Sequence, residues 1–150
     1  MEAKSLTADF RDFVGCLNDR GVEYLLIGGH AVAYHGYVRP TQDMDIWIAV
    51  TVANAERLAS ALDDFFGDRV AGVSAEMFLD AEQVTRFGVR PNLIEILGKI
   101  DGVEFEKAFA QRVVAELDGV RVNIIGMHEL KQNKKATGRN KDLADLDNLP

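Results

Sequence analysis

The sequence has little of several features that mark special classes of protein. It contains one cysteine, Cys16, so no disulfide framework is expected. No run of apolar residues approaches the roughly 18 that a membrane-spanning helix needs. The segment MEAKSLTADF at the start of the sequence lacks the apolar stretch of a secretory signal peptide. We therefore expect a cytoplasmic protein that does not enter a membrane.

Basic residues are outnumbered by acidic ones, 17 to 24, which gives a net charge of −7 at pH 7. A protein that binds nucleic acid non-specifically over a broad surface is normally basic, so the charge argues against such a surface but permits a local basic site. The 150 residues are 47% hydrophobic and contain no repeat, low-complexity tract or linker. This composition predicts a single domain over residues 1–150 with its own hydrophobic core.

Predicted helices and strands alternate in the first half of the chain, and a hairpin follows later. Apolar residues at helical spacing predict helices over residues 6–17, from residue 31, between Thr51 and Gly67, over 127–137 and over 141–149. Residues 103–110 suit a short helix or an insertion. Apolar runs predict strands over residues 24–27, 43–50, 83–89, 93–97, 112–117 and 120–125, with Asp118-Gly119 as a hairpin turn. We expect an α/β (α+β) fold with a mixed sheet flanked by helices.

Gly28 and Gly29 follow the buried apolar run 24–27 and precede a helical segment. Paired glycines suit a sharp turn in which the backbone is closely approached. Backbone N–H groups at the start of a helix can bind a phosphate. An ordinary tight turn explains the same two residues, so this feature alone leaves both interpretations open.

Two acids, Asp43 and Asp45, alternate at the start of an apolar strand and therefore share one face of it. Adjacent carboxylates repel each other and are costly to bury, so a cation such as Mg²⁺ would compensate them. Glu95 is a lone acid on another apolar strand, where it could complete the site and accept a proton from an attacking hydroxyl. The alternatives are a cap or an exposed edge for the aspartates and a solvent-facing position for Glu95.

The C-terminal segment LKQNKKATGRNKDLADLDNL contains a basic cluster inside an acidic chain. Lys131, Lys134 and Lys135 are three and four residues apart, which predicts that they share one face of a helix. A lysine on this face could neutralise a triphosphate. A solvated helix face is the usual meaning of such a run, and this alternative stays open here.

The order of these features, Gly-Gly, then Asp-x-Asp, then a lone acid, resembles the nucleotidyltransferase superfamily that includes DNA polymerase β. The segments IGGHAVAYHGYVRPTQDMDIWI and NKKATGRNKDLADL resemble small bacterial nucleotidyltransferases, including those related to AbiEii-type toxins. The resemblance covers residues 24–149. It implies a nucleotidyltransferase-like fold with a mixed sheet.

The resemblance implies that Asp43, Asp45 and Glu95 are the catalytic, metal-binding residues and hold two Mg²⁺ ions. Such ions, some 3.5–4 Å apart, stabilise the attacking and leaving oxygens of an in-line displacement. It also implies that the turn at Gly28 and Gly29 holds the phosphates of a nucleotide. Many members have Ser or Thr after the glycines, whereas this chain has His30. The imidazole could donate a hydrogen bond to the nucleotide in place of that hydroxyl, or it could be structural.

Further nucleotide-binding positions are implied by the same resemblance. Arg39 and Thr41 match the Arg-x-Thr that precedes the acids and positions them or the nucleotide. Lys134, Arg139 and Asp142 match the basic and acidic positions of the C-terminal segment, with Lys134 as the phosphate contact.

The resemblance implies an enzyme that transfers NMP from ATP or another NTP to an acceptor hydroxyl, at an RNA 3′ end or on a protein. A toxin-like enzyme of this kind would need an antitoxin protein as partner. An antibiotic-type adenylyltransferase is the nearest alternative, although such enzymes usually carry extra helices to hold the acceptor. The remaining alternatives are a non-catalytic nucleotide-binding subunit and a nucleotide-binding module that acts only with a partner.

Overall fold

The structure is a computed structural model that describes residues 6–67 and 72–150, and in these residues six strands form one sheet. The order of the strands across the sheet is β3-β4-β2-β1-β6-β5. The strands are β1 (Tyr24–Ile27), β2 (Asp43–Ile48), β3 (Val84–Phe87), β4 (Leu93–Leu97), β5 (Val113–Leu117) and β6 (Val120–Ile124). The helices are α1 (Ala8–Asp19), α2 (Gly28–Tyr34), α3 (Val52–Phe66), the short 3-10 helix η3 (Ala75–Phe78), α4 (Phe105–Ala110), α5 (Met127–Thr137) and α6 (Asn140–Asn148).

The sheet is mixed because neighbouring strands run in both relative directions. Strand β2 is parallel to β4 and antiparallel to β1, and β1 is parallel to β6. The outer strands β3 and β5 are antiparallel to β4 and β6. The predicted α/β fold, with a mixed sheet flanked by helices, is therefore confirmed.

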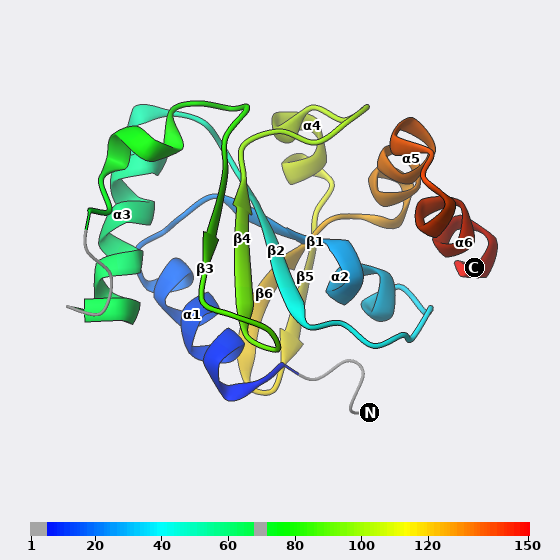
Figure 1. Ribbon diagram of the computed structural model, residues 1–150, viewed down its shortest axis with the longest axis horizontal. Coiled ribbons are helices and arrows are strands. Elements are labelled where there is room, and N and C mark those ends of the chain that lie inside the picture. Colours follow the sequence, from blue (N-terminus) through cyan, green and yellow to red (C-terminus); the bar gives the residue numbers. More distant parts are fainter. Residues whose placement is uncertain (1–5, 68–71) are drawn as a thin grey trace.

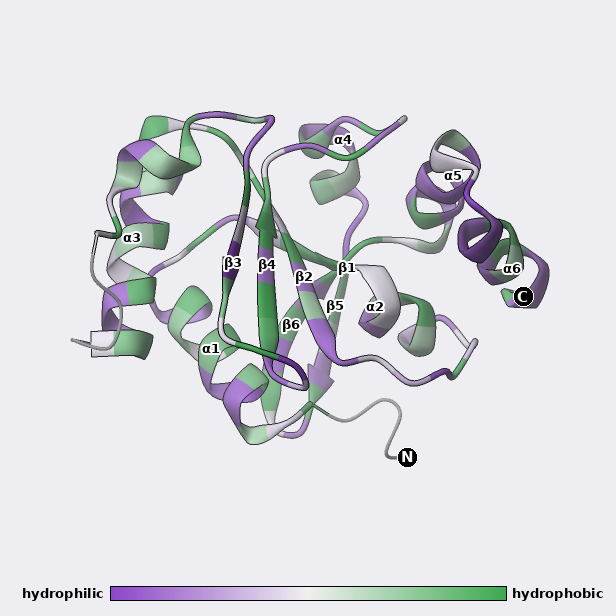
Figure 2. Ribbon diagram, in the orientation of Figure 1, coloured by the Kyte–Doolittle hydropathy of each residue, from purple (hydrophilic) through white to green (hydrophobic). Residues whose placement is uncertain are grey.

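The hydrophobic core includes residues of the central strands β1 and β2, and Figure 2 shows the start of β2, where its two aspartates lie, as hydrophilic. Every residue of β1 is buried. In β2, Met44 and Ile46 are fully buried, whereas the two aspartates that alternate with them are half-buried. Fully burying one such apolar side chain stabilises the fold by about 1.5–3 kcal/mol. Burial of Met44 and Ile46 therefore fixes the register of β2 and turns its acids to the opposite face.

Local turn and cap residues explain most element boundaries. The Thr51 hydroxyl accepts a hydrogen bond from the Asn54 N–H at 3.1 Å and caps α3, as predicted. Asp118 and Gly119, with φ of 51° and 80°, form the predicted hairpin turn. Helix α2 starts at Gly28 rather than at residue 31, because a φ of +68° turns the chain directly from strand to helix. Residues 103–110 contain the helix α4.

The basic C-terminal segment forms α5 and α6, which pack together at one end of the molecule, with α3 at the opposite end (Figure 1). Arg39, in the loop that leads into β2, contacts Asp145 of α6. This contact holds the C-terminal helices beside the acidic start of β2. Among the helices of the described residues, none has the length and apolar character needed to cross a membrane.

Candidate active site

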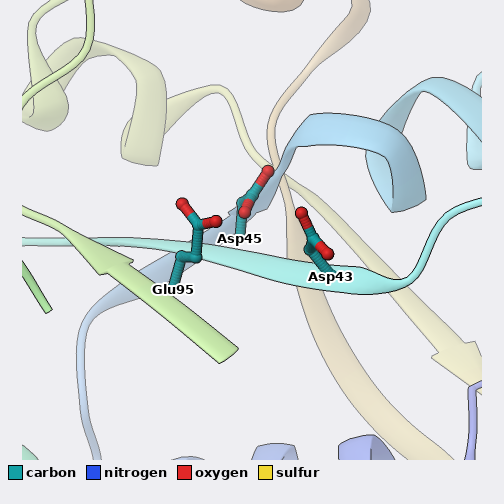
Figure 3. Close-up of side chains that lie close together, drawn as sticks. All are labelled: Asp43, Asp45 and Glu95. Carbon is teal, nitrogen blue, oxygen red and sulfur yellow. The ribbon is translucent and has the colours of Figure 1, made fainter. Parts of the chain in front are cut away.

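Three carboxylates from two adjacent strands lie close together. Asp43 and Asp45 come from β2 and Glu95 from β4, and the parallel register places Asp45 directly beside Glu95. One oxygen from each residue lies within 4.8 Å of the others, and Figure 3 shows the three side chains on the same side of the sheet. We call these three residues the acidic cluster. The structure thus brings together the three acids that the sequence predicted as metal ligands.

Burial, together with repulsion within the acidic cluster, shifts the pKa of Asp45. Burial, and then the charges of Glu95 and Asp43, raise this pKa from 3.8 to about 6, while Lys141 and Lys134 act in the opposite direction. A divalent cation would remove this repulsion. Carboxylate oxygens on rigid strands are the ligands that Mg²⁺ prefers, so the residues present fit this ion.

The two glycines after β1 lie against the site rather than in an open turn. A Cβ atom on Gly28 would overlap the Asp45 carboxylate, and the φ of +68° also favours glycine there. A Cβ atom on Gly29 would lie 2.8 Å from the Thr41 Oγ1 and 3.3 Å from the Arg39 Nη1. Both positions therefore require the absence of a side chain, which agrees with the close backbone approach predicted from the sequence.

Arg39 and Thr41 hold the loop that leads into β2. The Thr41 hydroxyl donates a hydrogen bond to the Asp43 carbonyl oxygen at 3.1 Å. The Arg39 guanidinium donates two hydrogen bonds to the Asp145 carboxylate, at 2.9 and 3.0 Å. Both side chains therefore position the start of the strand that carries the acids.

Lys134, Arg139 and Arg39 share two buried carboxylates in what we call the C-terminal ion network. The Lys134 Nζ lies 3.0 Å from Asp145 and 3.3 Å from Asp142, and the Arg139 Nε lies 2.7 Å from Asp142. Three cations and two anions leave this network with one positive charge. Its three cations line the cleft that opens over the acidic cluster, so the network contributes positive potential to this cleft.

The carboxylates of this network are held in the ionised form. Burial acts to raise the pKa of Asp142, but hydrogen bonds from Arg139 and Thr137 and the charge of Lys134 outweigh it, so the pKa is well below its usual value. Lys134 is only 5% exposed, whereas Lys135 is exposed. The single basic face predicted for the lysines of this helix is therefore wrong, because Lys134 turns inward to the buried acids.

A cleft of about 870 Å³ opens over the acidic cluster. Nine of the residues predicted from the sequence line it: Gly28, Gly29, Arg39, Thr41, Asp43, Asp45, Glu95, Lys134 and Arg139. Asp142 is fully buried behind Lys134 and Arg139 and does not line the cleft. Asp142 therefore binds these two cations and fixes their positions at the cleft.

His30 also lies away from the cleft lining. Its ring packs edge-on against Phe10 of α1, with the ring centroids 5.4 Å apart. The Nε2 atom is buried without a hydrogen-bond partner among the described residues, and burial lowers the pKa of the imidazole. This position favours the structural alternative that the sequence left open.

Several cleft residues were not identified from the sequence as site residues. Arg90 lies in the turn between β3 and β4, and its Nε is 3.0 Å from the Asp43 Oδ1. Arg86 is opposite Glu95 in the register of β3 and β4, and its Nε is 3.6 Å from the Glu95 Oε1. Lys141 also lines the cleft, and it has no ion-pair partner within the part of the chain that the structure describes. Arg86 is brought to the site by the pairing of β3 with β4, and Arg90 by the turn that joins these two strands.

Neither a family model nor a curated protein sequence matches the chain. Among solved structures, the chain is similar to a proposed nucleotidyltransferase from Thermotoga maritima, with 17% identity, a TM-score of 0.61 and coverage of 92% of this chain and 88% of that one. It is also similar to an antigenic nucleotidyltransferase-like protein from Paracoccidioides brasiliensis, with 19% identity, a TM-score of 0.55 and coverage of 95% and 75%. At these identities the comparison shows that the chain has a nucleotidyltransferase-like fold.

Proposed function

We propose that this protein is a Mg²⁺-dependent nucleotidyltransferase that transfers NMP from an NTP to an acceptor hydroxyl. The observation that carries the proposal is the acidic cluster, whose three carboxylates converge within 4.8 Å at a cleft that also contacts the positively charged C-terminal ion network. An acidic metal site beside positive potential is the arrangement that phosphoryl and nucleotidyl transfer require. The nucleotidyltransferase-like fold supports the same conclusion.

In this proposal, Asp43, Asp45 and Glu95 bind two Mg²⁺ ions, which supply charge stabilisation for an in-line displacement. The acceptor oxygen bonds to the α-phosphorus of the NTP, and the bond from this phosphorus to the leaving pyrophosphate breaks. The acceptor hydroxyl loses its proton to Glu95, which lies at the edge of the cluster on β4. Mg²⁺ at this site would take further oxygen ligands from substrate phosphates, because this ion rarely binds to protein carboxylates alone.

The nucleotide phosphates lie, in this proposal, between the Gly28-Gly29 turn and the C-terminal helices. The absence of side chains at both glycines lets the phosphate chain approach the backbone beside Asp45. Lys141 is the cation available for direct contact, because Lys134 is already engaged by two carboxylates. Lys134 and Arg139 act through the positive charge of the C-terminal ion network.

A transfer assay tests this function directly. The protein is incubated with Mg²⁺, each α-labelled NTP and total RNA or cell lysate, and the label is followed into macromolecules. The expected result is label in RNA or protein that is lost with Asp45→Asn. The matched control is Asp63→Asn, which makes the same change at an exposed position on α3 outside the cleft. Transfer that survives in Asp45→Asn would refute the proposed site.

The finer assignments rest on the sequence resemblance and stay proposals. The acceptor is an RNA 3′ end or a protein, and a toxin-like role requires an antitoxin protein. The fate of the label distinguishes these acceptors, and label in a small molecule would instead indicate an antibiotic-type adenylyltransferase. Binding of NTP without transfer would indicate a nucleotide-binding subunit.

A further inference from the structure

Two exposed arginines are paired with the acidic cluster from the side of β3. Arg90 donates a hydrogen bond from its Nε to the Asp43 carboxylate at 3.0 Å, and Arg86 lies 3.6 Å from Glu95. Their side chains are 62% and 61% exposed, and both line the cleft. Exposed ion pairs of this kind contribute little to stability, so the arginines are not needed to hold the fold.

These arginines differ from the other paired cations of the cleft in the identity of their partners. Arg39, Lys134 and Arg139 are paired with the carboxylates of Asp142 and Asp145, which do not belong to the acidic cluster. Lys99 pairs with Glu82, which is also outside the cluster. Within the described residues, only the partners of Arg86 and Arg90 are carboxylates that the proposed function assigns to Mg²⁺.

Binding of a divalent cation therefore has a specific consequence for this arginine pair. An ion held by Asp43 and Glu95 brings two positive charges to the oxygens that the guanidinium groups now contact. The metal competes with the guanidinium groups for the same carboxylate oxygens, and an exposed ion pair contributes little against this competition, so the arginines leave the carboxylates. Two uncompensated guanidinium groups then stand at the edge of the cleft.

The strand order, together with the proposed position of the nucleotide, indicates which substrate would meet these released arginines. Across the sheet, β3 and β4 lie on one side of β2, and β1 with its Gly28-Gly29 turn lies on the other. The nucleotide phosphates occupy the β1 side in the proposed function, so the β3 side is open to the acceptor. A guanidinium group binds phosphate through paired hydrogen bonds, which makes a phosphate on the acceptor the matching ligand.

We propose that Arg86 and Arg90 form a phosphate-binding site for a polynucleotide acceptor, which Asp43 and Glu95 mask until a divalent cation binds these carboxylates. This inference rests on the proposed function, because it needs the metal at the acidic cluster. It also explains how an acidic chain binds an anionic acceptor, since the basic site becomes available only when the metal is present.

The first test measures metal affinity alone, by titration calorimetry with Mn²⁺ in the absence of nucleotide. Arg90→Gln and Arg86→Gln should each tighten Mn²⁺ binding, by up to about fivefold, because the metal no longer displaces a guanidinium group. The matched control is Arg57→Gln, at an exposed position on α3 outside the cleft, which should leave the affinity unchanged. Circular dichroism checks that each variant is folded.

The second test measures the binding of a short single-stranded RNA without NTP, so that no transfer takes place. The wild-type protein should bind this RNA with Mn²⁺ and lose it when the metal is chelated. The double variant Arg86→Gln/Arg90→Gln should bind it at least tenfold more weakly in saturating Mn²⁺, since two charge-assisted contacts are lost. Inorganic triphosphate serves as the second probe, and its affinity should change much less.

These measurements separate failure of the inference from failure of the proposed function. The inference would be overturned if the double variant kept its affinity for RNA or lost affinity only for triphosphate. It would also be overturned if both single variants had an unchanged affinity for Mn²⁺. Mn²⁺ binding that is absent, or that is unaffected by Asp45→Asn, would overturn the proposed metal site and the inference with it.

Discussion

Replacing Asp45 with asparagine should stabilise the metal-free protein at pH 8. The folded protein raises the pKa of this carboxyl from 3.8 to about 6, so it disfavours the ionised form relative to the unfolded chain. At 1.36 kcal/mol per pH unit, this difference corresponds to roughly 3 kcal/mol. Asparagine has nearly the same shape and no charge, so the variant escapes this penalty and should gain up to about 3 kcal/mol.

The pH dependence follows from the direction of the shift. Between about pH 4 and pH 6 the folded protein binds more protons at Asp45 than the unfolded chain does, so the free energy of unfolding falls as the pH rises. Above the folded-state pKa the full penalty is present and no longer changes. The stabilisation by Asp45→Asn should therefore be small at pH 4 and reach its maximum above pH 7.

Urea unfolding in the presence of EDTA, at several pH values between 4 and 8, measures this difference. The control is Asp63→Asn, which removes a charge at an exposed position on α3. Mg²⁺ should reverse the order of stability at pH 8, because a ligand stabilises the state that binds it and the variant has lost one carboxylate ligand. An equal stability difference between variant and wild type at pH 4 and pH 8, or a variant less stable than the wild type at pH 8 without metal, would contradict the raised pKa of Asp45.

Two further substitutions test the packing around the site. Gly28→Ala should cost about 1–3 kcal/mol and weaken Mn²⁺ binding, because the new Cβ overlaps Asp45 at a positive φ. Gly15→Ala, where a Cβ meets no atom within 4 Å inside α1, should leave Mn²⁺ binding unchanged and give equal or higher stability. Thermal unfolding and calorimetry distinguish these outcomes, and equal behaviour of the two variants would contradict the close approach. Lys134→Met should cost about 3 kcal/mol in urea unfolding, because it takes a cation from two buried carboxylates. The same change at the exposed Lys135 should be nearly neutral, and a similar cost at both positions would refute the buried network.

Much of the fold could be predicted from the sequence because its signals are local. The strands 24–27 and 93–97 and the helix 127–137 have the predicted bounds, since apolar runs and turn residues define them. Asp43 and Asp45 share a face because side chains alternate along a strand, and this holds in any sheet. Such features need no knowledge of which strands are neighbours. The division of the chain into a single domain stays a prediction.

The rest of the site depends on pairings that no local pattern contains. Glu95 meets Asp45 because β4 is the parallel neighbour of β2, and Arg86 meets Glu95 because β3 pairs with β4 in a particular register. Lys134 was predicted as a phosphate contact, but it is buried between two carboxylates of the next helix. It therefore contributes to the site through the charge of the C-terminal ion network. His30 follows the glycines in sequence, yet it packs toward α1 instead of the cleft.

Locating the metal tests directly whether the acidic cluster is a metal-dependent nucleotide site. Crystals grown with Mn²⁺ and an NTP analogue that cannot be cleaved at the α-phosphate would show the ion by its anomalous scattering. We expect Mn²⁺ between the carboxylates of Asp43, Asp45 and Glu95, with the phosphate chain beside the Gly28-Gly29 turn. Nucleotide bound elsewhere, or bound in this cleft with no Mn²⁺ at these carboxylates, would contradict it.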